Sequence, residues 1–356
     1  MSEYGDRLKA EYDGLRPVYE KFTDELSGLL ERWLTDAGIE HLPIERRTKD
    51  GDSLLSKVER PEKSQKYLSC KDITDLSGVR IITYLQEDHD KVCDLIEKNL
   101  SIDTINSIEK QKALDENQFG YRSSHYVISY TDGRAAMPEC AKFAGLKAEI
   151  QVRTLLQHTW AAIDWKLRYK NTFEAPKELR RRLFRISALL ELADDEFSGL
   201  SQAIDKIRTS YQDKMSVGDL RIDIDNESIE IFVNQNETVR ALMKSAEGFG
   251  YNIAPFHPGS RNPYLALLQT ISIVDVCRID ELEKIISDGL VSGNEKLKLV
   301  FDEWKTPGKP AKLVIDAANI VRLFVVLASA KGKAKAALSN IPFGSELQRA
   351  LKHVVG

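Results

Sequence analysis

Residues 75–84 read DLSGVRIITY, and this stretch decides the fold. It predicts a buried strand, because a short β-branched run follows a glycine and is succeeded by a helical segment at residues 88–100. The same signals predict strands at residues 124–130 and 147–153. The last of these runs straight into a helix, for which Thr154 is the expected N-cap. Strands interleaved with helices predict an α/β fold.

A long amphipathic helix precedes this strand. Between Tyr4 and Trp33, apolar residues fall at steps of three and four, which places them on one helical face. Gly38 and Pro43 end the helix. The basic stretch that follows, residues 45–57, is predicted to be a turn that feeds a short helix.

The C-terminal part of the chain follows a different pattern. An apolar stripe at helical spacing predicts a connecting helix over residues 179–215. Alternation in residues 220–233 predicts a hairpin, and residues 237–355 are predicted to be mostly helical. We therefore expect two domains: residues 1–215, and a mostly helical domain at residues 216–356 whose ligand or protein partner the sequence does not specify.

Composition argues against a nucleic-acid-binding, disulfide-rich or membrane-spanning protein. The 356 residues carry 51 basic and 55 acidic side chains, so no overall charge favours nucleic acid or an anionic membrane surface. The four cysteines form no CxxC pair, which favours reduced thiols over a disulfide framework or a zinc site. No signal peptide is evident, and the most apolar run, residues 323–330, is too short to span a bilayer. We expect a cytoplasmic protein with no membrane partner.

The stretch at residues 47–57 supplies cations of a kind that phosphate chemistry requires. Transfer of a pyrophosphoryl group needs cations around a triphosphate, carboxylate-held Mg²⁺, and a base near the attacking hydroxyl. Here a turn presents Arg47 and Lys49, and the next helix places Ser53 and Lys57 one turn apart. Taken alone, a basic turn is more often a solvated surface.

Two acidic residues are candidates for a magnesium site. Asp75 heads the predicted strand that also carries Arg80, and Glu149 interrupts an apolar strand. On adjacent strands these carboxylates would hold one Mg²⁺, a cation that prefers oxygen ligands. The alternatives are a turn or N-cap role for Asp75 and a solvent-facing position for Glu149.

A loop and a strand–helix junction complete the candidate set. Residues 120–125, GYRSSH, place Tyr121 beside a cation and a histidine, and such a ring either stacks on a base or packs the loop down. The helix after the junction carries His158. Trp160 and Ile163 of this helix are assigned to the core.

Read in this order, these segments resemble the synthetase domain of the RelA/SpoT family, the (p)ppGpp synthetases of bacterial stringent signalling. The resemblance covers about residues 20–200 and is carried by RTKDGDSLLSK, DLSGVRII, GYRSSH, EIQVRT and QHTWAAIDWKLRYK. It implies a mixed β-sheet flanked by helices, related to nucleotidyltransferases. It further implies a GTP pyrophosphokinase that moves the β,γ-pyrophosphate of ATP to the 3′-hydroxyl of GDP or GTP with Mg²⁺. A homo-oligomer is a further expectation from the family.

The resemblance assigns a role to each candidate residue. Asp75 and Glu149 would be catalytic and bind Mg²⁺, and Glu149 would also draw the proton from the acceptor hydroxyl. The residues that would bind ATP are Arg47 and Arg80 at the adenine, with Lys49, Ser53 and Lys57 at the phosphates. The residues that would bind the acceptor are Tyr121, stacked on guanine, with His125, Gln151, Arg153 and His158.

The sequence departs from the family in three places. The acceptor loop at residues 116–121, ENQFGY, lacks the usual proline and lysine, which leaves the acceptor nucleotide in question. Asp164-Trp165 replaces a Glu-His pair in the helix. The one His-Asp dipeptide, His89-Asp90, falls at what reads as a surface helix start, so we expect no hydrolase activity.

Two alternatives to (p)ppGpp synthesis stay open. The same chemistry would act on the 3′ end of tRNA in a toxic member of the family. The altered loop favours this alternative, as does a basic cluster that is otherwise a solvated face: Lys177, Arg180, Arg181, Arg182 and Arg185. The other alternative is a non-catalytic nucleotide-binding module that works through the C-terminal domain. The intact pair of metal carboxylates disfavours it.

Overall fold

The computed structural model describes residues 3–60, 66–109, 123–169, 177–255, 262–292, 294–305 and 310–356. The chain forms two compact units, Met1–Ser201 and Gln202–Gly356. The division falls inside helix α6, Lys177–Ser216, whereas the sequence placed the domain boundary at the end of that helix. Among the helices of the described ranges, none combines the length and the apolar character that crossing a membrane requires.

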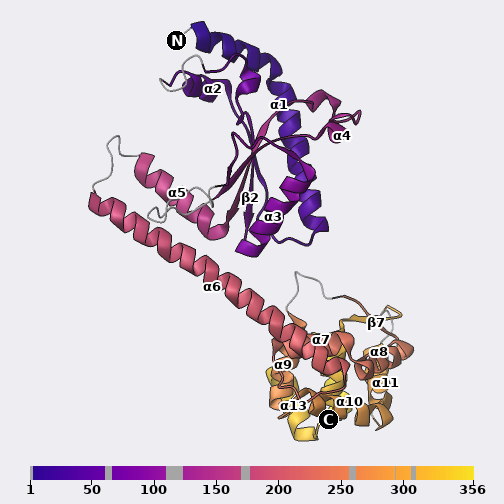
Figure 1. The fold of residues 1–356 in the computed structure, drawn as a ribbon. Coiled ribbons are helices and arrows are strands. Elements are labelled where there is room, and N and C mark those ends of the chain that lie inside the picture. The colour runs from indigo at the N-terminus through magenta and orange to yellow at the C-terminus, as the bar shows by residue number, and fades with distance from the viewer. Residues whose placement is uncertain are drawn as a thin grey trace. The chain divides into compact units, whose positions relative to one another are not determined.

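The first unit is built on a mixed sheet (Figure 1). The strand order is β1-β2-β6-β5-β3, with β4 paired to β5; β2 and β6 run parallel, and the other pairs run antiparallel. The strands are β1 Glu45–Thr48, β2 Ser77–Thr83, β3 Ser101–Ile102, β4 Ile108–Glu109, β5 Ser124–Ser129 and β6 Ala148–Thr154. The three strands predicted from the sequence are present as β2, β5 and β6, and the predicted α/β class is confirmed.

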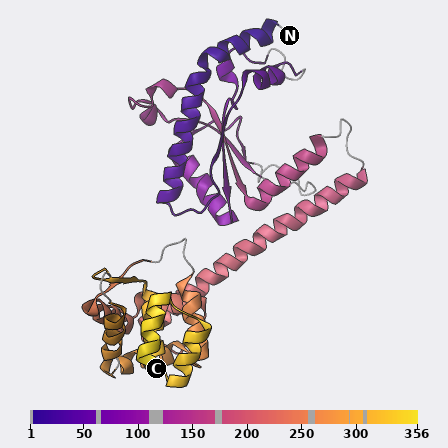
Figure 2. The ribbon, with the colours of Figure 1, turned by 180° about the vertical axis from the view of Figure 1, so that it is seen from behind.

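Helices cover both faces of this sheet. Figures 1 and 2 show α1, Glu3–Asp36, and α3, Gln86–Asn99, on one side of the sheet and α5, Leu155–Tyr169, on the other. The core lies under α1, where Tyr19 and Phe22 are buried together with the inward side chains of the strands. The shorter helices of the unit are α2 Gly51–Val58, η2 Cys70–Asp72, α4 Asp132–Ala135 and η3 Ala141–Phe143.

Two local predictions in the first unit are wrong. Residues 45–48, predicted as part of a turn, form β1, because their backbone pairs with residues 77–80 of β2. Their side chains are polar, so no hydrophobic pattern marks the strand. Ile163, assigned to the core, is 48% exposed, whereas Trp160 is buried as predicted.

The second unit is mostly helical, as predicted, with one small parallel sheet of two strands. Its elements are α7 Asn226–Gln235, α8 Glu237–Phe249, β7 Tyr251–Ile253, α9 Pro263–Ile273, α10 Ile279–Ser292, α11 Asn294–Trp304, β8 Leu313–Ile315, α12 Ala317–Ala328, α13 Lys331–Asn340 and α14 Ser345–Val355. The predicted hairpin at residues 220–233 is wrong. Asp225 and Ser228 form a capping box that starts α7 inside the alternating stretch.

A substitution at Gly250 tests the packing of the second unit. It ends α8 at φ +107, and a Cβ at this position would overlap the ring of Phe301. We expect Gly250→Ala to lower the free energy of unfolding by about 2–4 kcal/mol, because both the backbone and the ring must shift. Chemical denaturation of the full chain measures this change.

Gly248→Ala is the matched control, since a Cβ there meets no atom within 4 Å. It lies inside α8 and should raise the free energy of unfolding by about 0.5–1 kcal/mol. Equal stability of the two variants would contradict the packing described for Gly250.

Candidate active site

The polar side chains of β6 lie on the face of the sheet opposite α1 and α3. Side chains alternate along a strand, so Ile150 and Val152 are buried in the core under α1. Glu149, Gln151 and Arg153 occupy the alternate, partly exposed positions. One strand therefore presents three of the predicted site residues on a single face.

Neighbouring strands add further residues to this face. Arg80 of β2 pairs with Gln151 on one side, and His125 of β5 pairs with the same residue on the other. Next to β2, β1 places Glu45 opposite Arg80. Residues directly opposite on paired strands share a face, so these side chains meet above β6.

A pocket of about 440 Å³ opens on this face. Its volume is within the usual range for a small-molecule site. Its lining residues are Glu45, Arg46, Arg47, Lys49, Asp75, Gly78, Val79, Arg80, Glu149 and Gln151. Six of the predicted site residues are among them, and they come from β1, β2, β6 and the segments that flank β1 and β2.

Asp75 lies between two lysines at the start of β2. Its Oδ2 accepts a hydrogen bond from Lys49 Nζ at 2.6 Å, and its Oδ1 accepts one from Lys57 Nζ at 2.6 Å. Burial raises the pKa of Asp75, but the charges and hydrogen bonds of the two lysines outweigh it and hold the pKa below its usual value. Asp75 is therefore ionised at neutral pH. Lys57 reaches this carboxylate from α2, a contact that was not predicted from the sequence.

Glu149 is held by residues predicted to bind the acceptor. Its Oε1 lies 3.1 Å from His125 Nδ1, and its Oε2 accepts a hydrogen bond from Gln151 Nε2 at 3.0 Å. Burial raises the pKa of Glu149, but the hydrogen bond and charge of His125, together with the hydrogen bond from Gln151, outweigh burial and hold the pKa below its usual value. The charge of Asp75 also acts on Glu149 and raises its pKa. The two carboxylates are thus close enough to interact, and they share the pocket.

Two arginines stand at the other end of the polar face. Arg80 Nε donates to Gln151 Oε1 at 3.2 Å, and a terminal nitrogen of Arg153 donates to the same oxygen at 3.2 Å. Arg80 also forms an ion pair with Glu45 at 2.7 Å. Burial, and then the charge of Arg80, lower the pKa of Arg153 to about 10. Two mutually repelling guanidinium groups favour an anionic ligand at this place.

His158 of α5 faces this pair of arginines. Burial lowers its pKa, and the charges of Arg80 and Arg153 lower it further, while Glu45 opposes them. Its Nδ1 and the Nε of Arg153 are buried and have no hydrogen-bond partner among the described residues. Such buried polar atoms are uncommon in folded proteins and fit a ligand that would supply the missing partners.

Six predicted residues are not among those that line the pocket. Of these, Lys57 and His125 contact its carboxylates, Arg153 contacts Gln151, and His158 lies near the arginines. The other two are Ser53 and Tyr121. The Ser53 hydroxyl donates to Asp50 Oδ2 at 2.8 Å, within the cap of α2. Tyr121 lies outside the described residues.

The donor set fits Mg²⁺ in combination with a phosphate ligand. No group of three or more His, Cys, Asp or Glu side chains that could hold a metal occurs in the described ranges. Asp75, just before β2, and Glu149, on the neighbouring strand β6, offer carboxylate oxygens beside one pocket. Mg²⁺ is commonly bound by one or two carboxylates, with substrate phosphates and water completing its shell.

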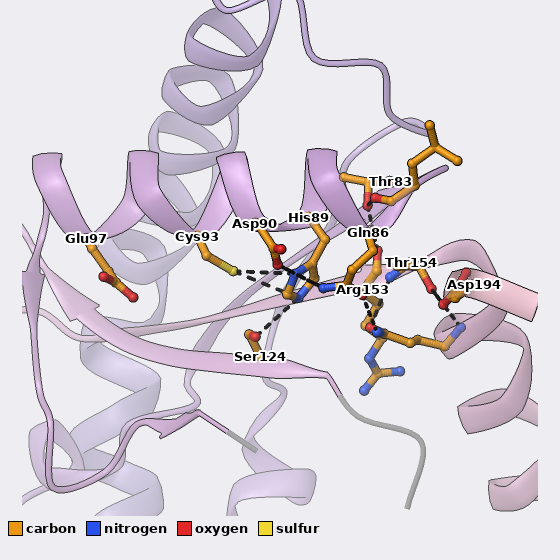
Figure 3. A network of polar contacts seen from close by, with 12 residues as sticks. Thr83, Gln86, His89, Asp90, Cys93, Glu97, Ser124, Arg153, Thr154 and Asp194 are labelled. Atoms are coloured by element: carbon orange, nitrogen blue, oxygen red, sulfur yellow. Dashed lines mark hydrogen bonds and ion pairs between the residues drawn. The ribbon is translucent and has the colours of Figure 1, made fainter. Parts of the chain in front are cut away.

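A buried polar network lies on the other face of the sheet (Figure 3). His89 is 3% exposed, so the surface position expected for the His89-Asp90 pair is wrong for the histidine. Its Nδ1 lies 2.9 Å from Asp90 Oδ1, and its Nε2 lies 3.2 Å from the hydroxyl of Ser124. Burial lowers the pKa of His89, but the hydrogen bonds to Asp90 and Cys93 raise it to about 9. The protonated ring anchors the start of β5, one residue before His125.

Thr154 caps helix α5 where strand β6 ends, next to Arg153 of the site. Its hydroxyl accepts a hydrogen bond from Gln157 N at 3.2 Å, and Gln157 Oε1 accepts one from Thr154 N at 3.0 Å. The predicted N-cap is therefore confirmed as a capping box. The Thr154 hydroxyl also donates to Asp194 of α6 at 2.6 Å (Figure 3). The Thr-x-x-Gln spacing marks the box in the sequence, but no local signal marks Asp194.

The sequence has known relatives. The family model described as a region found in RelA / SpoT proteins matches residues 46–174. The chain is 25% identical over 212 residues to GTP pyrophosphokinase YjbM of Bacillus subtilis (strain 168), which spans 59% of this chain and 89% of that protein. It is 28% identical over 170 residues to GTP pyrophosphokinase YwaC of the same strain, which spans 46% and 77%. A crystal structure of small alarmone synthetase 1 from Bacillus subtilis aligns at 23% identity and a TM-score of 0.44, over 55% of this chain and 99% of that one.

The protonation of His89 is directly measurable. Its folded pKa of about 9 lies above the ordinary value of 6.5, so its stabilising effect is complete below pH 6.5 and is lost as the pH rises through 9. We expect the ring to titrate near pH 9 by NMR. The stability advantage of the native chain over His89→Gln should shrink between pH 6.5 and 9. A midpoint near 6.5 would contradict the network as described.

Proposed function

We propose, from the premise that residues 46–174 are a RelA/SpoT region, that this protein is a GTP pyrophosphokinase. It transfers the β,γ-pyrophosphate of ATP to the 3′-hydroxyl of GDP or GTP and so makes (p)ppGpp, without a hydrolase activity. Two relatives with the name GTP pyrophosphokinase align over 89% and 77% of their own lengths, which supports the proposal. A cytoplasmic location agrees with nucleotide substrates.

One observation carries the proposal. Asp75 and Glu149 line the same pocket as Arg47, Lys49 and Arg80. Carboxylates for a divalent cation, combined with several cations for phosphate oxygens, are what a triphosphate bound with Mg²⁺ requires. A site for an uncharged ligand needs neither group.

The phosphate end of ATP belongs beside Lys49 and Lys57 in this proposal. Both ammonium groups lie 2.6 Å from the carboxylate oxygens of Asp75. Asp75 and Glu149 would hold Mg²⁺, which when bound neutralises negative charge on the phosphate oxygens. Arg47 and Arg80 are proposed to flank the adenine.

Glu149 is the proposed base at the acceptor end. The contact with His125 keeps its pKa low, so the carboxylate is available to accept a proton at neutral pH. The acceptor 3′-oxygen bonds to the β-phosphorus of ATP as the bond from that phosphorus to the α-phosphate oxygen breaks, and AMP leaves. The hydroxyl proton passes to Glu149. Gln151, Arg153, His125 and His158 are proposed to orient the acceptor nucleotide, together with Tyr121.

Glu149→Gln tests this role. The amide keeps the size of the side chain but removes the base and a metal ligand, so we expect product formation to fall at least about 1,000-fold. Purified protein with ATP, Mg²⁺ and GDP or GTP, followed by separation of nucleotides, measures it. Glu139→Gln, at an exposed position, is the control and should retain activity within about twofold. More than a tenth of native activity in Glu149→Gln would remove the base from the mechanism.

The exposed arginines of α6 suggest a second candidate acceptor, the 3′ end of tRNA. Arg181, Arg182 and Arg185 are exposed near the start of this helix and would contact an RNA backbone. ATP labelled in its γ-phosphate, offered with GDP, GTP or deacylated tRNA, separates the two activities. We expect label in the guanosine nucleotides alone. Label in tRNA would establish the toxin-like activity, and ATP binding without transfer to any acceptor would indicate a non-catalytic module.

A further inference from the structure

A series of hydrogen-bonded side chains connects α6 to strand β5 through residues that the proposed reaction does not use (Figure 3). It begins at Asp194 of α6, whose Oδ2 accepts a hydrogen bond from the Thr154 hydroxyl at 2.6 Å. Thr154 shares its capping box with Gln157, and Gln157 Nε2 donates to Gln86 Oε1 at 3.2 Å. The network thereby passes from α6, through the junction of β6 and α5, to the first turn of α3.

The same network continues from α3 to β5. Gln86 Nε2 donates to Asp90 Oδ1 at 2.8 Å, and that oxygen lies 2.9 Å from His89 Nδ1. The other ring nitrogen of His89 lies 3.2 Å from the hydroxyl of Ser124, at the start of β5. His89 and Ser124 are both less than a tenth exposed, so water competes little for this contact.

The network adjoins residues proposed to bind the acceptor, and not those proposed to bind ATP. Three network residues are direct chain neighbours of acceptor residues, in the pairs Ser124–His125, Arg153–Thr154 and Gln157–His158. No residue proposed to bind ATP has such a neighbour. Successive side chains of a strand point to opposite faces, so on β5 and β6 the network holds one side chain while the next one faces the site. A disturbance of the network therefore displaces acceptor-binding side chains first.

Asp194 is the contribution of α6 to this network. It is 5% exposed, and its hydrogen bond with Thr154 joins residues 40 apart in the chain. A buried carboxyl group needs hydrogen-bond partners, and a hydroxyl that donates at 2.6 Å is a short and strong one. Ser187 and Ser198 are buried on the same face of α6, but their hydroxyl oxygens have no partner among the described residues. Of these three side chains, Asp194 is the one that ties α6 to the strand that carries the site.

We propose that Asp194 is a positioning residue for the acceptor nucleotide. By accepting the hydrogen bond of Thr154, it fixes the point at which β6 ends and α5 begins, and this point carries Arg153 and His158. Both of these side chains have a buried nitrogen without a partner among the described residues, so their placement decides how well a ligand can supply one. The inference rests on the proposed function, because it concerns the acceptor of that reaction.

Asp194→Ala tests this role, and Asp195→Ala is its matched control. The alanine removes the acceptor of the Thr154 hydrogen bond, so we expect the KM for GDP to rise about tenfold while the KM for ATP stays within about twofold. Asp195 is the next residue of α6 and is exposed, so its replacement should leave both KM values within about twofold of native. A side chain with a purely structural role would lower the stability and the yield of folded protein and leave both KM values as they are.

Conservative variants separate the hydrogen bond from the charge. Asp194→Asn keeps an oxygen that accepts from Thr154, so the KM for GDP should stay within about threefold of native. Thr154→Val removes the same hydrogen bond from the other partner and should reproduce the selective rise, which keeps the test available if Asp194→Ala does not fold. In the Thr154→Val background, adding Asp194→Ala should change the KM for GDP by less than about twofold.

Calorimetric titration with GDP, in the presence of Mg²⁺ and a non-hydrolysable ATP analogue, measures acceptor binding without turnover. We expect the Kd for GDP to rise about tenfold in Asp194→Ala and to stay at the native value in Asp195→Ala. A native chain that neither binds GDP nor forms product would contradict the proposed function, and with it the acceptor site that Asp194 would serve. A native chain that does both, beside an Asp194→Ala variant that binds GDP equally well, would overturn only the role of Asp194.

Two further results would overturn the proposal. One is an Asp194→Ala variant whose KM for ATP rises as much as its KM for GDP, since this would indicate a general disturbance of the unit. The other is an Asp194→Asn variant as impaired as Asp194→Ala, since the hydrogen bond with Thr154 would then not be the connection.

Discussion

The parallel pairing of β2 with β6 is the constraint on which the site depends. It places Gly78 opposite Glu149, three residues after Asp75 in the chain. Two carboxylates that are more than seventy residues apart in sequence thereby meet at one pocket. Parallel strands require a long crossover, and here that crossover contains α3 and β5. The same pairing aligns Arg80 with Gln151, so the cationic end of the pocket is set by the same register.

The pocket holds charges of both signs in an arrangement that is costly without ligands. Asp75 and Glu149 repel each other, and so do Arg80 and Arg153. The protein offsets part of this cost with local partners: two lysines at Asp75, and His125 with Gln151 at Glu149. A polyphosphate with a divalent cation would relieve both repulsions at once, since it brings negative charge to the arginines and positive charge to the carboxylates. Functional sites commonly concentrate such unfavourable pairs because the surrounding fold can support them.

Local signals in the sequence were sufficient for the elements that carry the chemistry. The β-branched runs predict β2, β5 and β6, and the place of Thr154 between a strand and a helix predicts its role as a cap. Features set by distant partners were not accessible in this way. The polar residues of β1 become a strand only because β2 lies beside them, and the buried ring of His89 has a partner in Ser124, 35 residues further along the chain. Residues 220–233 alternate like a strand, but the capping box of Asp225 and Ser228 starts helix α7 within them. Arg47, Arg80, Glu149 and Gln151, which lie on strands, line the pocket, whereas the hydroxyl of Ser53 turns to its own helix cap.

The central claim is that Asp75 and Glu149 hold one divalent cation between them. The most direct measurement is anomalous diffraction from crystals of the protein grown with Mn²⁺ and a non-hydrolysable ATP analogue, since Mn²⁺ takes the same oxygen ligands as Mg²⁺. We expect a single anomalous peak with a carboxylate oxygen from each of the two residues about 2.1–2.2 Å away. A peak bound to only one of them, or to neither while the analogue occupies the pocket, would contradict the claim.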